Sequence, residues 1–175
     1  EYLQDWEITW IIAKGLSFVP EHAVPKRTYL EIDKGRPAEA RQILNKFLKD
    51  YKPDVAVCFQ APWWVHFSIW KARIKTRIGV LSKWDSFLFL NKGLRQRRSL
   101  ALKHEAEYNL DLVRQIDPER ISDSKAPVLK LQADKHDSVL NSEGLEAQKY
   151  SVVHPGMAGS ALNWPTEYYI ELIAK

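Results

Sequence analysis

The sequence has little of what cross-links small proteins or anchors them in membranes. It holds one cysteine, Cys58, which excludes an internal disulfide bond and a zinc site built from several cysteines. Cys58 lies in an apolar run, so we expect it to be a core residue, not a nucleophile, in a protein of the reducing cytoplasm. No apolar run reaches the roughly 18 residues that a membrane-spanning helix needs.

Signals of several other classes are also missing. The sequence has no G-x-G-x-x-G dinucleotide motif, no Gly-Lys-Ser/Thr of a P-loop and no internal repeat. It begins Glu-Tyr-Leu-Gln-Asp, without the basic region of a signal peptide and without an initiator methionine, and it stops at Lys175 inside a predicted helix. We therefore expect a fragment of a longer protein.

The composition is that of a folded globular domain, with 45% hydrophobic and 27% charged residues. Strands and helices alternate along it, which predicts an α/β fold with a parallel sheet. The predicted strands cover residues 6–13 (a buried strand), 26–32, 54–59 and 77–81, and the predicted helices cover residues 36–51, 63–72 and 100–116. Residues 15–26 contain two prolines and a glycine, which predicts a loop with His22 as a solvated histidine.

Ligands of open α/β sheets bind at the carboxyl ends of the strands. Here the strand at 54–59 runs into Gln60, two small or cyclic residues and two tryptophans. We interpret the nearby His66 as a packing residue, because it lies one helical step from Trp70. His136 lies in a polar turn without other ligands at metal spacing, so we expect no metal site there.

Residues 150–175 predict a strand at 150–153, a loop bracketed by Gly156 and Gly159, and a helix with Pro165 in its first turn. Such a junction directs unpaired backbone N–H groups and the positive end of a helix at one point, which suits a phosphate. The GxxG spacing is also typical of an ordinary turn between a strand and a helix. The spacing alone leaves both interpretations open.

Positive charge is concentrated in residues 71–104, which hold ten Lys and Arg against one acid, Asp85. The net charge of +4 is therefore a local +9 on a chain that is otherwise −5. Within this stretch Trp84 and residues 87–90 form an apolar knot. The knot is either core with the arginines as a solubilising rim, or a surface for a membrane interface or a lipid. Cations interleaved with aromatic residues could also bind RNA or single-stranded DNA, although no RNA-binding motif is present.

Three passages resemble one family. HPGMAGSALNWPTEYYIEL is similar to the segment that opens the second domain of the ADP-heptose:lipopolysaccharide heptosyltransferases, glycosyltransferase family 9. ARIKTRIG and LKHEAEYNLDLV resemble passages of the family's first domain, and all three occur in the family's order. The resemblance implies a two-domain GT-B glycosyltransferase. We expect a Rossmann-like first domain at 1–120 that lacks its first strand, an interdomain linker with one strand (128–131) at 121–148, and the start of a nucleotide-sugar-binding domain at 149–175.

The resemblance also implies the site residues. The donor phosphates would be bound by the loop residues His154, Gly156, Gly159, Ser160, Ala161, Asn163 and Trp164. The acceptor would be bound by Arg95, Arg97, Arg98, Lys103, His104 and Glu107, although His104 and Glu107 could equally form an ion network on the helix surface, as the i,i+4 pair Lys103 and Glu107 suggests. Many family members carry a cation where this sequence has Leu162. The family's catalytic Asp follows a Gly in a Gly-Asp motif that is absent here, so we expect it upstream and expect this chain alone to be inactive.

By resemblance, the protein transfers a heptose from ADP-heptose to the lipopolysaccharide inner core with inversion, without a metal or a cofactor. Its partners would be the nucleotide-sugar donor and the anionic acceptor, with no nucleic acid. It would be cytoplasmic, and peripheral at the inner face of the bacterial inner membrane. The alternatives are a nucleic-acid-binding module and another nucleotide-sugar enzyme of the same architecture, such as an epimerase.

Overall fold

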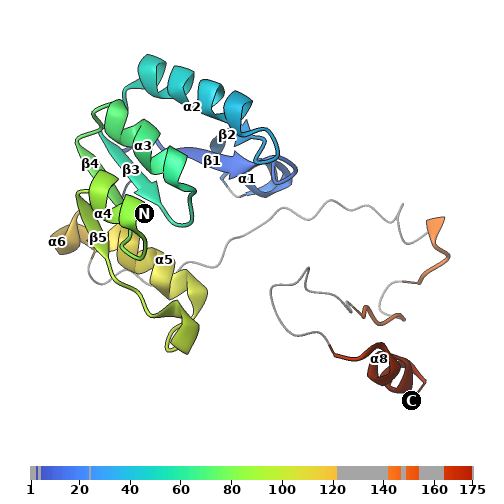
Figure 1. Ribbon diagram of the computed structural model, residues 1–175. Coiled ribbons are helices and arrows are strands. Elements are labelled where there is room, and N and C mark those ends of the chain that lie inside the picture. The colour runs from blue at the N-terminus through green and yellow to red at the C-terminus, as the bar shows by residue number, and fades with distance from the viewer. Residues whose placement is uncertain are drawn as a thin grey trace. The chain divides into compact units, whose positions relative to one another are not determined.

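The computed structural model describes residue 3 and residues 5–23, 25–121, 142–146, 149–153 and 164–174 (Figure 1). The chain divides into two compact units, Glu1–Gln132 and Ala133–Lys175, and each is described by itself. Most of the predicted linker at 121–148 lies outside the described residues, including the strand predicted at 128–131. The predicted domain limits therefore stay predictions.

The first unit alternates strands and helices as the sequence predicted. Its elements are β1 (Thr9–Ala13), α1 (Phe18–His22), β2 (Thr28–Ile32), α2 (Pro37–Tyr51), β3 (Val55–Cys58), α3 (Trp63–Lys71), β4 (Thr76–Val80), α4 (Trp84–Phe89), β5 (Lys92–Leu94), the 3-10 helix η1 (Arg98–Leu100), α5 (Glu105–Arg114) and α6 (Pro118–Ile121). β1 pairs with β2, and β3, β4 and β5 form a second sheet in that order. All these pairs are parallel, which confirms the predicted fold class.

The local sequence of α2 accounts for where this helix begins, where it ends and which of its residues are buried. It begins at Pro37, whose missing N–H and fixed φ suit the first turn of a helix. It ends at Tyr51, and the next residue, Lys52, caps it in a left-handed conformation with φ of 47° and donates its backbone N–H to Leu48 O. Ala40, Leu44 and Leu48 recur at spacings of four and are all buried. They form the stripe that holds the helix against the strands.

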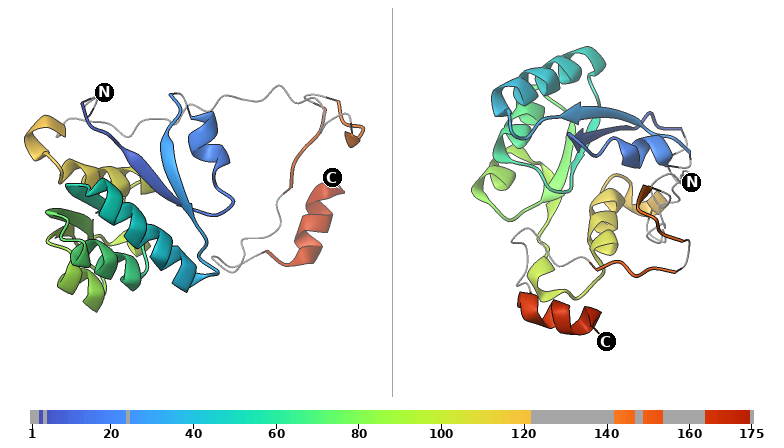
Figure 2. Two further views of the ribbon diagram at one scale, coloured as in Figure 1. Left: turned by 90° about the horizontal axis from the view of Figure 1, so that it is seen from above. Right: turned by 90° about the vertical axis from the view of Figure 1, so that its right-hand side faces the viewer.

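The helices cover both sides of the strands. α2 and α3 lie together on one side, and α5 lies on the other (Figures 1 and 2). The core under α2 and α3 consists of Ile32, Ala40, Leu44, Leu48, Trp64, Ile69, Ile74 and Leu90. Ile78 on β4 and Leu112 on α5 are fully buried. α3 and α4 begin shortly after the carboxyl ends of β3 and β4.

Three predictions of local structure in the first unit are wrong. Residues 15–26 are not all loop, because residues 18–22 form α1. β1 is not a buried strand: Ile11 is 42% exposed, because β2 is its one partner strand in the described part of the chain. α5 begins at Glu105, five residues later than predicted, because the preceding residues form η1 and an extended N-cap at His104.

The second unit is described in three short pieces. Residues 150–153 form no strand, because no other described strand pairs with them and a β-strand needs a ladder partner. The predicted helix exists as α8 (Thr166–Ile173), with Pro165 at its N-cap. The Trp164 ring lies 5.8 Å from that of Tyr168 and 5.6 Å from that of Tyr169, centroid to centroid. Among the described helices of the chain, none is both long and apolar enough to cross a membrane.

Candidate functional site

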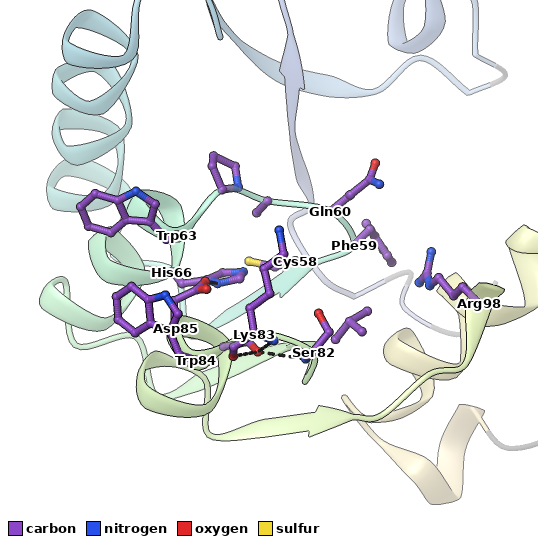
Figure 3. Close-up of a pocket in the computed structure, with 14 residues that line it drawn as sticks. Cys58, Phe59, Gln60, Trp63, His66, Ser82, Lys83, Trp84, Asp85 and Arg98 are labelled. Atoms are coloured by element: carbon purple, nitrogen blue, oxygen red, sulfur yellow. Dashed lines mark hydrogen bonds and ion pairs between the residues drawn. The ribbon is translucent and has the colours of Figure 1, made fainter. Parts of the chain in front are cut away.

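A cavity of about 480 Å³ opens where β3 and β4 end (Figure 3). Its volume lies within the range of small-molecule sites, and its place at the carboxyl ends of parallel strands is where α/β sheets bind ligands. The lining comes from the ends of β3 and β4, the first turns of α3 and α4, and η1. The lining residues are Cys58, Phe59, Gln60, Ala61, Pro62, Trp63, His66, Val80, Ser82, Lys83, Trp84, Asp85, Ser86 and Arg98.

A buried hydrogen bond joins two of the lining residues. His66 Nδ1 lies 2.7 Å from Asp85 Oδ2, and the two residues are 6% and 3% exposed. Their meeting follows from topology: α3 and α4 follow neighbouring parallel strands, so their first turns lie at the same edge of the sheet. A carboxylate can accept a hydrogen bond but not donate one, so the proton of this bond belongs to Nδ1.

The other nitrogen of this histidine, Nε2, has no partner within the described part of the chain. Among the described residues, none is within hydrogen-bonding geometry of His66 Nε2, and Nε2 is not one of the fully buried polar atoms of this part of the chain. The ring itself lines the cavity. Because Nδ1 holds the proton, the neutral ring presents a lone pair on Nε2.

Two cations contribute to the same cavity. Lys83 is the N-cap residue of α4; its backbone N–H donates to Ser86 Oγ at 3.2 Å, while its side chain lines the cavity (Figure 3). Arg98 is held from the side by Glu105, and by Gln96 and Asn109 at 2.9 and 3.0 Å. These bonds keep the Arg98 guanidinium in one orientation, and the ion pair with Glu105 partly compensates its charge.

The cysteine that lines the cavity has an unreactive thiol. Cys58 is the last residue of β3, and burial raises the pKa of its thiol to about 12. The thiol therefore stays protonated at neutral pH, and a protonated thiol is a poor nucleophile. This agrees with the interpretation of Cys58 as a packing residue, although it also lines the cavity.

The structure separates the six residues predicted to bind the acceptor. Arg98 lines the cavity, and the other five are not among its described lining residues. Lys103 pairs with Asp111 at 2.8 Å, and Glu107 pairs with Arg114 at 3.8 Å. The predicted pair of Lys103 with Glu107 is wrong, because Lys103 precedes the helix and therefore lacks helical i,i+4 geometry. His104 caps α5, its Nδ1 accepting the N–H of Ala106.

The remaining two arginines, Arg95 and Arg97, lie on the surface, and Arg95 contacts the apolar knot. The Arg95 guanidinium lies 5.2 Å from the centroid of the Phe87 ring, and Arg97 is exposed. The knot itself is divided: Phe89 and Leu90 are buried, whereas Trp84, Phe87 and Leu88 are 67%, 49% and 62% exposed. The core interpretation thus holds for Phe89 and Leu90, whereas a membrane or lipid contact of the exposed residues stays a prediction.

The predicted donor loop can be compared at one position. His154, Gly156, Gly159, Ser160, Ala161 and Asn163, and with them Leu162, lie outside the described residues. Trp164 is described and is 54% exposed. The assignment of this loop to the donor phosphates stays a prediction. Within the part of the chain that the structure describes, no cluster of His, Cys, Asp and Glu has the arrangement of a metal site.

Sequence reasoning missed the pair of His66 and Asp85. The spacing of His66 from Trp70 is a local relation, whereas its hydrogen-bond partner lies 19 residues away in the sequence. One signal pointed to it: Asp85 is the one acid among ten cations in residues 71–104, and it follows the end of a strand. Because Asp85 is buried, that stretch exposes cations without any exposed acid.

No protein-family model matches this chain. In sequence it is similar to a protein from Haemophilus influenzae named "Putative glycosyltransferase", with 39% identity over 112 residues, which are 59% of this chain and 32% of the relative. The chain therefore spans about a third of the length of that relative. In structure it is similar to the crystal structure of the glycosyl transferase family 9 from Veillonella parvula, with a TM-score of 0.69 and 18% identity, covering 95% of this chain and 49% of that one.

Both likenesses are to glycosyltransferases, as the three sequence passages predicted. The structural likeness confirms the predicted Rossmann-like α/β architecture. At 18% identity it establishes the fold and not the reaction. The sequence likeness carries the relation to glycosyltransferases, over a stretch about as long as the first unit.

Proposed function

We propose that this chain contributes the acceptor-side domain of an enzyme that transfers a sugar from a nucleotide sugar. The observation that carries the proposal is the 39% identity over 112 residues to a glycosyltransferase of Haemophilus influenzae. The cavity at the ends of β3 and β4 supports it, because that is the edge at which a sheet of this kind binds its ligands.

The charge of the cavity supports an anionic acceptor. Lys83 and Arg98 line it, and the one acid within residues 71–104 is buried against His66. Arginine and lysine suit carboxylates and phosphates. The three passages that resemble the heptosyltransferases support ADP-heptose as the donor and the lipopolysaccharide inner core as the acceptor. By the same resemblance the transfer inverts the anomeric carbon and needs no metal, with the donor phosphates at residues 154–164.

The exposed half of the apolar knot supports peripheral contact with a membrane. Trp84, Phe87 and Leu88 are all at least about half exposed, and Arg95 lies over the Phe87 ring. Apolar side chains beside cations are the features that place a surface segment at an anionic lipid interface. The acceptor proposed here is itself a lipid of the inner membrane, so one surface would serve both contacts.

The acceptor is tested by calorimetric titration of the chain with an inner-core lipopolysaccharide fragment that carries its acidic sugars. We expect binding that is lost when the carboxylates are methyl esters. Lys83→Gln should weaken it about tenfold, the size of one charge-assisted hydrogen bond. Lys71→Gln is the matched control, because Lys71 is an exposed lysine outside the lining of the cavity, at the far end of α3.

Two results would contradict this proposal. Equal affinity for the ester would mean that the cations do not recognise the acceptor's charge. Tighter binding of a single-stranded oligonucleotide, persisting at high salt, would favour a nucleic-acid-binding module, because nonspecific phosphate contacts weaken steeply as salt rises. Titration with ADP-heptose, compared with ADP-glucose, separates a heptosyltransferase from other nucleotide-sugar enzymes of this architecture.

A further inference from the structure

We propose that Trp63 and Trp84 bind the apolar face of a sugar ring in the cavity at the ends of β3 and β4. The inference rests on the proposed function and deepens it, because it names residues that recognise the ring of the acceptor sugar and not its charge. Both indoles line the cavity, and they are 49% and 67% exposed. They therefore offer a ligand a large apolar surface.

The topology of the sheet brings the two indoles to one place. Trp63 is the first residue of α3, and Trp84 is the first residue of α4. Because β3 and β4 are neighbouring parallel strands, the helices that follow them begin at the same edge of the sheet. Figure 3 shows both indoles on the side of the cavity away from Arg98. Two residues that are distant in the sequence thus form one apolar wall.

Contacts outside the cavity hold each indole without burying it. The guanidinium carbon of Arg41 lies 5.3 Å from the centroid of the Trp63 ring, and such a cation–π contact orients the ring. The Trp84 ring lies 6.3 Å from that of the buried Phe89, centroid to centroid. The next residue after Trp63, Trp64, is 7% exposed and belongs to the core. Core packing of α3 therefore uses Trp64 and leaves Trp63 at the cavity.

A second tryptophan of α3 shows that exposure alone does not make this site. Trp70 is 47% exposed, almost the same as Trp63, but it is not among the described lining residues of the cavity. Its ring packs 5.7 Å from that of Phe67 and 5.5 Å from that of Phe89, centroid to centroid. Trp70 has a structural partner on its own surface. It is therefore the matched control for Trp63.

The rest of the lining favours a sugar over a wholly apolar ligand. A pyranose has a face of C–H groups and a rim of hydroxyls, and the negative face of an indole attracts the slightly positive C–H groups. Gln60 and Ser82 bring side chains that can bind hydroxyls, and Lys83 brings a cation for an acidic group. A lipid chain would leave these polar groups unpaired. A nucleobase also stacks on indoles but has no rim of hydroxyls, and the test below includes it.

NMR of the indole Nε1–H groups tests the inference on the whole chain, with resonances assigned from Trp→Phe variants. We expect the resonances of Trp63 and Trp84 to shift on titration with the inner-core fragment and with methyl β-D-glucopyranoside, a neutral pyranose. The resonance of Trp70 should stay. Glucitol is the ligand control, because it has the hydroxyls of a sugar but no ring face, and it should shift none of the three. Equal responses to glucitol and the pyranoside, or a larger response to AMP than to the pyranoside at equal concentration, would overturn the inference.

Affinity for the inner-core fragment tests the contribution of the flat ring. Trp63→Leu should weaken binding about tenfold, because leucine keeps an apolar surface but loses the aromatic face. Trp63→Phe keeps an aromatic face and should stay within about threefold of the wild type. Trp70→Leu makes the same change as Trp63→Leu outside the cavity and should leave the affinity unchanged. Backbone amide spectra show whether each variant is folded.

The outcomes separate this inference from the proposed function. If the fragment binds but the resonances of Trp63 and Trp84 do not respond, the inference fails and the proposed function stands. If the fragment does not bind but the pyranoside shifts both resonances and not that of Trp70, the proposed acceptor fails and the sugar site stands. If neither ligand shifts them, the inference fails.

Discussion

Gly79 and Gly93 face each other on β4 and β5, and a Cβ on Gly93 would lie 2.5 Å from the carbonyl oxygen of Gly79. The nearest obstacle is backbone, which cannot move without disturbing the ladder. We therefore expect Gly93→Ala to lower the free energy of unfolding by about 2 kcal/mol, measured by urea denaturation. Gly35→Ala is the control, because its Cβ would meet a side-chain oxygen of Asp33 at 3.1 Å, and that side chain can turn away. Equal losses in both variants would contradict the close approach.

The stripe on α2 gives a second prediction. Leu44 is fully buried, so Leu44→Ala should lower the free energy of unfolding by about 2 to 5 kcal/mol, through lost burial and the cavity left behind. Leu102→Ala makes the same chemical change at a side chain that is 73% exposed, and it should cost less than about 0.5 kcal/mol. Thermal denaturation of both variants measures the difference. Similar costs would show that α2 does not pack as described.

The ion pairs of α5 can be separated by double-mutant cycles. Lys103 is 2.8 Å from Asp111, so the pair should show a coupling energy of about 0.3 to 1 kcal/mol that falls with salt. The cycle of Lys103 with Glu107 should give a coupling near zero, because Lys103 precedes the helix. A larger coupling energy for Lys103 with Glu107 than for Lys103 with Asp111 would support the helical i,i+4 pair expected from the sequence.

The raised pKa of Cys58 predicts that the stability of the folded chain depends on pH. Burial in the folded chain raises the pKa of its thiol to about 12, from 9.0 for a free thiol. Between these values the unfolded chain loses a proton that the folded chain keeps, so the free energy of unfolding falls as the pH rises from 9 to 12. Cys58→Ala should make that fall shallower. In iodoacetamide labelling at pH 8.5, the native chain should react on the order of a hundredfold or more slowly than the urea-unfolded chain. Equal rates would mean an accessible thiolate.

The exposed half of the knot predicts membrane binding. In co-sedimentation with phosphatidylglycerol vesicles, Leu88→Ser should release most of the bound protein, because Leu88 is 62% exposed beside the cationic surface. Leu16→Ser removes a leucine that is 46% exposed outside residues 71–104 and should bind as the wild type does. Phosphatidylcholine vesicles should bind neither. Loss of binding in both variants alike would contradict a specific surface at α4.

The sequence by itself determined most of the local structure and the class. Apolar spacing located α2 and the strands β2, β3 and β4 within a few residues, because the 3.6-residue and parallel-strand patterns are properties of the chain alone. Pro37 placed the start of a helix for the same reason. The three passages resembling heptosyltransferases identified the glycosyltransferase fold without any knowledge of contacts.

Tertiary structure decided what depends on distant partners. Spacing could not show that Asp85 hydrogen-bonds to His66, since the 18 residues between them include the rest of α3 and all of β4. Spacing could not show that Lys103 forms its ion pair with Asp111, because the partner depends on where α5 begins. Nor could it divide the apolar knot, in which Phe89 is buried and its neighbour Leu88 is exposed. Burial and hydrogen bonding are set by the whole fold, because they depend on residues that are distant in the sequence and adjacent only after folding.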